Sequence, residues 1–218
     1  LLGAFSSMMN RKLNVSQAVT IASNIEAKVL NTPTGTQDYY PPLLGGVNVL
    51  NYSHEGCRPE KFVNKECMKE LEKNFLLVYT GIPHHSGLNN WEVLKNSIEK
   101  KGDTIKSLAK LKNTADDMKT VLNSGNWKAL RSLFNHEYEA RVQLSPVFSS
   151  PEIERLRKVA LSSGAEAVKI CGAGGGGCVM VWCPPDSKKG VVESCQSAGF
   201  QVLPARPVEA GLEVVVSV

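Results

Sequence analysis

The sequence of 218 residues has little net charge and no long apolar run, and each shortage excludes a class of protein. Its 25 basic and 21 acidic side chains leave a formal charge of +4 and are interspersed along the chain. This nearly even balance of charge does not favour nucleic acid or an anionic membrane surface as a partner. The longest uncharged runs, residues 39–54 and 170–185, are shorter than the roughly 18 apolar residues of a membrane span. We therefore expect no transmembrane helix.

The six cysteines form no Cys-x-x-Cys pair and have no histidine at zinc-finger spacing, so neither a zinc site nor a thioredoxin-like motif is predicted. Cys171, Cys178 and Cys183 lie in apolar sequence and are interpreted as small buried residues. Unpaired cysteines are typical of the reducing cytoplasm, which is the expected location. With 42% hydrophobic residues, the chain has enough apolar side chains for one or two ordinary cores.

The first seventy residues predict two helices, an irregular segment and a strand. Apolar residues repeat at helical spacing from Leu1 to Met9, without an initiator Met or an N-cap, so the chain is expected to begin inside a helix. Ser16 is predicted to cap a second helix that ends near Leu30. Residues 31–42 are interpreted as irregular because of their prolines, and a strand is predicted up to about Tyr52.

The remainder of the chain predicts a different pattern, in which strands alternate with helices. The order from residue 74 is one strand, several helices, two strands, a helix and a strand, which is typical of a split βαβ, ferredoxin-like arrangement with extra helices. The predicted ranges are strands at 75–79, 167–171, 178–183, 200–203 and 212–218, and helices over 91–138 with breaks near 102 and 125, over 151–163 and over 185–198.

The strongest local motif is a glycine run between two predicted strands. It contains Gly172, Gly174, Gly175, Gly176 and Gly177. The spacing formally matches a dinucleotide-binding fingerprint, but a strand follows it where that motif requires a helix. The run is interpreted either as a permissive turn, or as a loop whose N–H groups bind an anion or which lets a phosphate-binding loop approach closely.

Two carboxylates and one polar loop are further candidates for chemistry. Glu26 lies on the apolar stripe of a predicted helix, where a buried carboxylate needs a metal ion or a basic partner, although it is also consistent with a helix edge that reaches water. Asp38 lies in a Pro- and Gly-constrained loop and is either a turn former or a fixed carboxylate. His84, His85 and Ser86 follow a buried strand, where binding residues often lie, or else form a solvated loop.

Taken together, four stretches resemble the GHMP kinases, the family of galactokinase, homoserine kinase, mevalonate kinase and phosphomevalonate kinase. These are the helix with Glu26, PTGTQDYYPPLLGG at 33–46, VYTGIPHHS at 78–86 and KICGAGGGGCVMVW at 169–182. Residues 37–38 and 79–81, and QLSPVFSSPEIERL before the glycine run, look most like the branch of D-glycero-D-manno-heptose 7-phosphate 1-kinase.

The resemblance implies a reaction and a role for each candidate residue. ATP would be the phosphoryl donor, with Mg²⁺ held partly by Glu26, and the carboxylate of Asp38 would take the proton of the acceptor hydroxyl. The glycine run would support the ATP phosphate loop. Gly35, Tyr39, His85 and Ser86 would line the pocket of a small-molecule sugar or sugar-phosphate substrate. No nucleic acid or membrane partner is implied.

The resemblance also implies an α/β (α+β) fold of two domains. Residues 1–70 would be a remnant of a ribosomal-protein-S5-like N-terminal catalytic domain, and residues 71–218 a ferredoxin-like C-terminal domain. The family's own glycine-rich phosphate loop has no counterpart in the sequence, so we expect the chain alone to be an inactive fragment that needs its N-terminal segment. Alternatives are a galactokinase- or mevalonate-kinase-type substrate, and a non-catalytic ferredoxin-like binding module.

Overall fold

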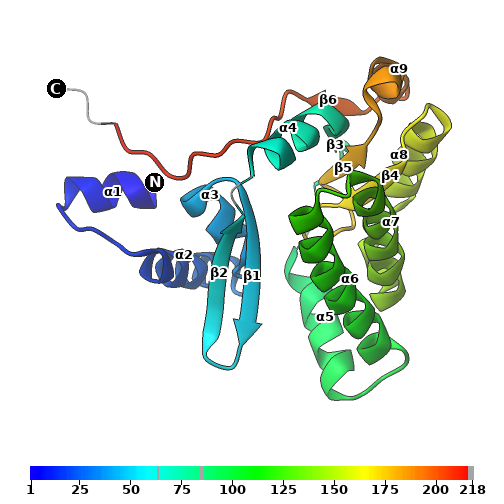
Figure 1. Ribbon diagram of the computed structural model, residues 1–218. Coiled ribbons are helices and arrows are strands. Elements are labelled where there is room, and N and C mark those ends of the chain that lie inside the picture. Colours follow the sequence, from blue (N-terminus) through cyan, green and yellow to red (C-terminus); the bar gives the residue numbers. More distant parts are fainter. Residues whose placement is uncertain (63, 84–85, 216–218) are drawn as a thin grey trace. The chain divides into compact units, whose positions relative to one another are not determined.

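The computed structural model describes residues 1–62, 64–83 and 86–215, and for residues 86–90 and 146 it describes the backbone alone. The chain forms two compact units (Figure 1). Unit 1 contains residues 1–68 and the chain from Pro207 onward, and unit 2 contains residues 69–206. The C-terminal end therefore groups with unit 1, whereas the sequence analysis assigns it to the second domain. None of the described helices combines the length and the apolar composition of a membrane-spanning segment.

Unit 1 consists of short helices and one β-hairpin. Its elements are α1 (Leu2–Met8), α2 (Val15–Leu30), the 3₁₀ turn η1 (Gln37–Tyr39), α3 (Tyr40–Leu44), β1 (Val47–Ser53) and β2 (Gly56–Phe62). The two strands pair antiparallel from Val47 opposite Phe62 to Ser53 opposite Gly56. Figure 1 shows them as two long cyan arrows joined by a tight turn.

The predicted helices of unit 1 are confirmed, with corrections at their boundaries. Asn14, and not Ser16, caps α2, because its side chain accepts from the Gln17 N–H while the Gln17 side chain accepts from the Asn14 N–H. The segment predicted to be irregular contains η1 and α3. Pro41 and Pro42 fit in α3 because they occupy its first turn, where a missing N–H costs no helical hydrogen bond.

Unit 2 is built on a four-stranded sheet. Helix α4 (Lys65–Asn74) leads into it, and the other elements follow in order: β3 (Phe75–Tyr79), α5 (Ser86–Ile98), α6 (Thr104–Ser124), α7 (Trp127–Leu144), the 3₁₀ turn η2 (Pro146–Phe148), α8 (Pro151–Ser162), β4 (Ala167–Ile170), β5 (Cys178–Trp182), α9 (Pro185–Ser197) and β6 (Gln201–Leu203). The strand order is β4-β5-β3-β6, and every neighbouring pair is antiparallel. This arrangement confirms the predicted ferredoxin-like sheet. The strand predicted at 212–218 does not form in its described part, residues 212–215.

The core of unit 2 lies between the sheet and the helices α8 and α9. Alternate strand residues point to this face, as expected from the two-residue period of a strand. The core cluster includes Val78, Val168, Ile170, Val179 and Val181 from the strands, Ile153, Leu156 and Ala160 from α8, and Val191 and Cys195 from α9. A second cluster joins α7 to the sheet, where the ring of Phe75 lies edge-on to Phe134 and to Trp182, with centroids 5.3 and 4.8 Å apart.

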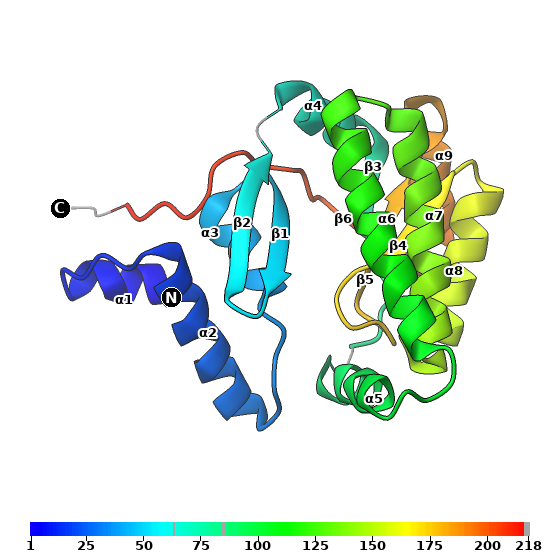
Figure 2. The ribbon, with the colours of Figure 1, turned by 60° about the horizontal axis from the view of Figure 1, so that its bottom comes forward.

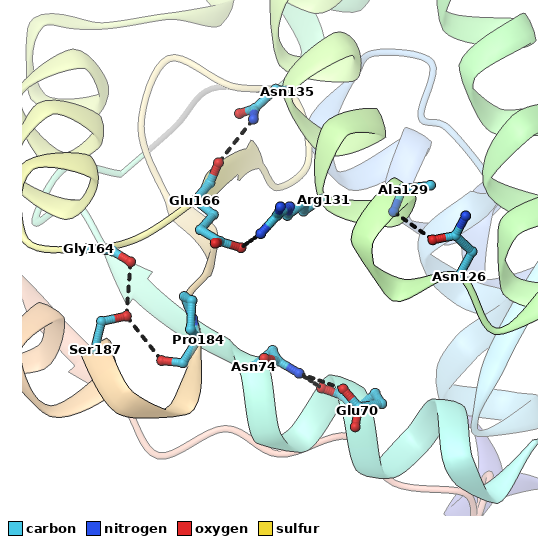
Figure 3. Close-up of polar contacts among 10 residues, drawn as sticks. All are labelled: Glu70, Asn74, Asn126, Ala129, Arg131, Asn135, Gly164, Glu166, Pro184 and Ser187. Atoms are coloured by element: carbon cyan, nitrogen blue, oxygen red, sulfur yellow. Dashed lines mark hydrogen bonds and ion pairs between the residues drawn. The ribbon is translucent and has the colours of Figure 1, made fainter.

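Helix α7 runs beside α6 and along β4 (Figure 2). Polar contacts fix it to the turn before that strand (Figure 3). There Arg131 forms an ion pair of 2.5 Å with the Glu166 carboxylate, and the Asn135 side chain donates to the Glu166 carbonyl at 3.0 Å. On the other side of the sheet, the Ser187 hydroxyl joins the start of α9 to the Gly164 carbonyl after α8, at 2.9 Å. These contacts fix the start of β4 and the region after β5, which are the ends of the two strands opposite to the glycine run.

Candidate functional site

The glycine run closes the connection between β4 and β5 in unit 2. The two strands pair from Ala167 opposite Trp182 to Ile170 opposite Val179, and the Cys171 N–H donates to the Cys178 carbonyl at 3.1 Å. Residues 172–177 therefore lie immediately beyond the end of the paired strands. They form a loop that is longer than a tight hairpin turn requires.

Two glycines of this loop lie so close to neighbouring backbone that no side chain fits. A Cβ atom on Gly174 would lie 2.5 Å from the Phe148 carbonyl oxygen, and one on Gly176 would lie 2.8 Å from the Ile82 carbonyl oxygen. Gly174 also has φ of +72°, a conformation that favours glycine. Glycine is thus needed here for close backbone packing, and the permissive-turn interpretation does not account for it.

Part of the polar backbone of the loop is used within unit 2. The Gly175 N–H donates to the Phe148 carbonyl at 3.0 Å, and the Gly177 N–H donates to the Ile82 carbonyl at 2.8 Å. Both the N–H and the hydroxyl of Thr80 donate to the Gly177 carbonyl at 2.9 Å. The N–H groups of Gly175 and Gly177 are therefore committed to the protein and do not face a ligand. This geometry favours a supporting role for the loop over a nest of free N–H groups.

A buried carboxylate lies beside the strand that leads into the loop. The side chain of Glu137 on α7 is 8% exposed, and its Oε1 atom forms ion pairs with Arg141 at 2.5 Å and Lys169 at 3.4 Å. Burial raises the pKa of Cys171, two residues after Lys169, although the positive charge of Lys169 partly offsets this effect. The thiol form of Cys171 is thus favoured over the thiolate.

In unit 1, the loop that carries Asp38 is fixed to its surroundings at three points. The Tyr39 hydroxyl donates to Oε2 of Glu26 on α2. The Thr34 hydroxyl donates to the Ser23 carbonyl, also on α2, at 3.4 Å. The hydroxyls of Thr36 and Tyr52 are 2.9 Å apart and join the loop to β1. The structure therefore links Asp38 and Glu26 through the intervening Tyr39, and both carboxylates are exposed.

Two tyrosines near this loop, Tyr40 of α3 and Tyr52 of β1, have raised pKa values. Burial, reinforced by a hydrogen bond with Cys57, raises the pKa of Tyr40 to about 12. Burial also raises the pKa of Tyr52, and the negative charge of Asp38 contributes to the same direction. Both phenols therefore stay neutral at physiological pH, with the Tyr40 hydroxyl engaged by Cys57 and the Tyr52 hydroxyl by Thr36.

Of the four residues predicted to line a substrate pocket, the structure describes two in full. Gly35 is exposed, and a Cβ atom placed on it would meet no atom within 4 Å. Tyr39 is half-buried. His85 lies outside the described residues, and for Ser86 only the backbone, which begins α5, is described.

The described carboxylates fit only a limited metal-binding role. Among the described residues, no three His, Cys, Asp or Glu side chains come together as a metal site. Mg²⁺ at a phosphoryl-transfer site usually takes only one or two carboxylates together with substrate phosphates and water. An exposed Glu26 that accepts one hydrogen bond from Tyr39 fits that limited role.

The sequence analysis missed four residues that shape these two sites: Thr36 and Tyr52 in unit 1, and Glu137 and Arg141 in unit 2. The i, i+4 spacing of Glu137 and Arg141 on a predicted helix is a readable ion-pair signal. The burial of Glu137 and its contact with Lys169 cannot be predicted from the sequence, because they depend on how α7 packs along β4.

Comparisons with known proteins find similarity to small-molecule kinases. Residues 105–201 match the family model described as GHMP kinases C terminal. The chain is 25% identical over 198 residues to D-glycero-alpha-D-manno-heptose 7-phosphate kinase from Campylobacter jejuni. The aligned region covers 88% of this chain and 56% of that protein. It is 29% identical over 140 residues to a protein named probable glucuronokinase 2 from Arabidopsis thaliana, covering 62% of this chain and 37% of that protein.

Solved structures show the same fold. A D-glycero-D-manno-heptose 1-phosphate kinase from Bacteriodes thetaiotaomicron superimposes with a TM-score of 0.71 at 21% identity, over 98% of this chain and 60% of the other. This likeness confirms the predicted α/β fold, and the family-model match together with the heptose kinase relative confirms the resemblance noted from the sequence. The chain spans about half the length of the curated relatives that it matches.

Proposed function

We propose that the full-length protein is an ATP-dependent sugar kinase, because residues 105–201 match the model of the GHMP kinase C-terminal domain. Its substrate would be a sugar or sugar phosphate of the heptose 7-phosphate type, phosphorylated at the anomeric hydroxyl. The observation that carries the proposal is the loop of Asp38, in which the neighbouring Tyr39 hydroxyl donates to Glu26. This contact links the carboxylate suited to proton transfer with the one suited to a metal ion.

In this mechanism Asp38 is the catalytic base. A sugar hydroxyl is a weak nucleophile at neutral pH, and a carboxylate within hydrogen-bond reach accepts its proton as the oxygen bonds to phosphorus. The bond between that phosphorus and the oxygen of the ADP leaving group breaks in the same step. The contacts of Thr34, Thr36 and Tyr39 hold the Asp38 loop in one place, which lowers the cost of orienting the base.

Glu26 and the glycine run would serve the phosphate donor. When bound, Mg·ATP supplies the phosphoryl group and a metal ion that neutralises the phosphate charge. Glu26 would provide one oxygen ligand. The glycines of the run would support the loop that holds the ATP phosphates; they are Gly172, Gly174, Gly175, Gly176 and Gly177. By the resemblance, Gly35, Tyr39, His85 and Ser86 would contact the acceptor, and of these Gly35 is exposed.

The first test is ADP release by the full-length protein with Mg·ATP and a panel of heptose 7-phosphate, glucuronate, galactose and mevalonate. The full length is used because the chain alone covers little more than half of its heptose-kinase relative and is proposed to be inactive. Turnover on one sugar or sugar phosphate would support the proposal and identify the acceptor. Ligand binding without ADP release on any substrate would instead favour a non-catalytic module of the same fold.

The second test is Asp38→Asn in the full-length protein. The amide cannot take the proton, so we expect kcat to fall by about 100-fold or more, while the KM for ATP changes little. The control is Asp186→Asn, which changes an exposed aspartate on α9. A variant with wild-type kcat would remove Asp38 as the base.

A further inference from the structure

Glu137 has an unusual environment for a residue to which the proposed reaction assigns no role. Its carboxylate is buried, and Oε1 accepts from both Nε and Nη2 of Arg141, at 2.7 and 2.5 Å. Lys169 Nζ donates to the same oxygen at 3.4 Å. Oε2 has no hydrogen-bond partner among the described residues. A buried carboxylate held by two cations is costly to desolvate, so it is a weak source of stability and invites another explanation.

Arg141, one of the two cations, contacts Phe148, which in turn contacts the middle of the glycine run. The Arg141 guanidinium lies 5.8 Å from the centroid of the Phe148 ring. The Phe148 carbonyl accepts from the Gly175 N–H, and Gly174 lies so close to that carbonyl that it has no room for a Cβ atom. Any movement of Phe148 is therefore passed directly to the loop.

Lys169, the other cation, lies on the strand that ends at the beginning of the run. Lys169 is on β4, three residues before Gly172, and its Nζ also donates to the Ile170 carbonyl at 3.2 Å. The side chains of Lys169 and Arg141 are 27% and 21% exposed, so neither is freely solvated. Without the Glu137 charge, two close cations would repel each other, and the strand end and η2 would lose their common partner.

We propose that Glu137 is a positioning residue for the glycine run, which it holds through Arg141 and Phe148 on one side and through Lys169 on the other. This inference rests on the proposed function in one respect, namely that the run supports the ATP phosphate loop. The carboxylate touches neither substrate nor reacting atoms in this role. It fixes the backbone that would support the ATP phosphate loop.

The experiment measures amide hydrogen exchange by NMR in the 218-residue chain, comparing wild type with Glu137→Gln. The Gly175 amide should exchange about tenfold faster in the variant, because its acceptor, the Phe148 carbonyl, is no longer held. The Cys183 amide, which donates to the Asn74 carbonyl at 2.8 Å elsewhere in unit 2, should be unchanged. The matched control is Glu139→Gln, an exposed glutamate on the same helix.

A kinetic measurement on the full-length protein separates this inference from the proposed function. Glu137→Gln should raise the KM for ATP by about fivefold and leave the KM for the acceptor unchanged, because only the nucleotide support moves. A purely structural role would lower kcat through a smaller folded fraction and leave both KM values unchanged.

Each outcome has a defined meaning. Equal acceleration of the Gly175 and Cys183 amides, or no acceleration, would overturn the positioning role even if the wild type is an active kinase. An inactive wild type would refute the proposed function, while the exchange data would still decide whether Glu137 holds the loop. If Glu137→Gln does not fold, Arg141→Gln breaks the same contact at a more exposed side chain and should accelerate Gly175 exchange alike.

Discussion

At the scale of single residues, Glu154 shows how neighbours decide the charge of a group. Burial alone would raise the pKa of this carboxyl, but hydrogen bonds from Ser149 and Tyr138 and the charge of Arg157 outweigh burial and lower it. Both hydroxyls donate to the same Glu154 oxygen at 2.6 Å. In return, burial and the bond to Glu154 raise the pKa of Tyr138 to about 12. The cluster therefore depends on an ionised Glu154.

A lowered pKa in the folded state implies a pH-dependent contribution to stability. That contribution is present above the unfolded-state pKa of a glutamate, about 4.3, and is lost as the pH falls through the lower folded-state value. Glu154→Gln should reduce the free energy of unfolding at pH 7 by about 1 kcal/mol or less, because the residue is exposed and solvent screens its charge.

Urea unfolding at pH 7 and at lower pH measures this difference. The gap between wild type and variant should shrink as the solution is acidified. Glu152→Gln is the control, because it also removes a charge from the first turn of α8. A gap that stays constant with pH would show that the Glu154 charge does not stabilise the cluster.

At the scale of elements, the β4–β5 connection shows why this loop contains glycine. The strands end where Cys171 pairs with Cys178, and the next residues pass against the backbone of η2 and of residues 82–83. Those neighbours come from distant parts of the chain. The sequence indicates a glycine-rich connection, whereas the need for glycine at Gly174 and Gly176 follows from contacts with Phe148 and Ile82.

Gly174→Ala should be strongly destabilising. The new methyl group would lie 2.5 Å from the Phe148 carbonyl oxygen at a positive φ, so we expect a loss of roughly 2–4 kcal/mol in the free energy of unfolding. Gly190→Ala is the control, because that glycine is on α9 with open space around it, and alanine there should be neutral or stabilising. Urea unfolding compares the two, and equal stability would contradict the close packing of the loop.

At the scale of the whole molecule, the chain returns to unit 1 after completing unit 2. The Gly46 N–H donates to the Val208 carbonyl at 2.8 Å, and Lys61 Nζ donates to the Leu44 and Glu209 carbonyls at 2.7 and 2.9 Å. Gly211 lies against Leu43, where a Cβ atom would be 2.2 Å from the carbonyl oxygen. These contacts make the C-terminal segment part of the unit that contains Asp38.

Deletion of residues 207–218 should therefore affect the two units differently. We expect the Gly46 amide, which loses its acceptor, to exchange at least about tenfold faster, while the Cys183 amide of unit 2 exchanges as before. Hydrogen exchange resolved by residue makes the comparison, with Cys183 as the internal control. If both amides lose protection together, the two units unfold as one, and the segment is not specific to unit 1.

Much of this architecture was predictable because it depends on local pattern. The helix from Pro151 with its Ser150 cap, the break at Gly125 and the strand–glycine–strand unit were all read from capping residues and apolar spacing. Strand β2 was missed because charged and polar residues dominate it, and its pairing with β1 comes from the hairpin. The strand predicted from the alternating valines near the C-terminus has no partner strand in its described part.

By itself, the sequence determined the order of elements, the ferredoxin-like class of unit 2 and the candidates Asp38, Glu26 and the glycine run, since each is carried by spacing or by a short motif. Only the tertiary structure decided that Tyr39 links Asp38 to Glu26, and that Glu137 lies between Arg141 and Lys169. The physical reason is that burial and hydrogen bonding depend on which distant segments pack together, and periodicity along the chain contains no such information.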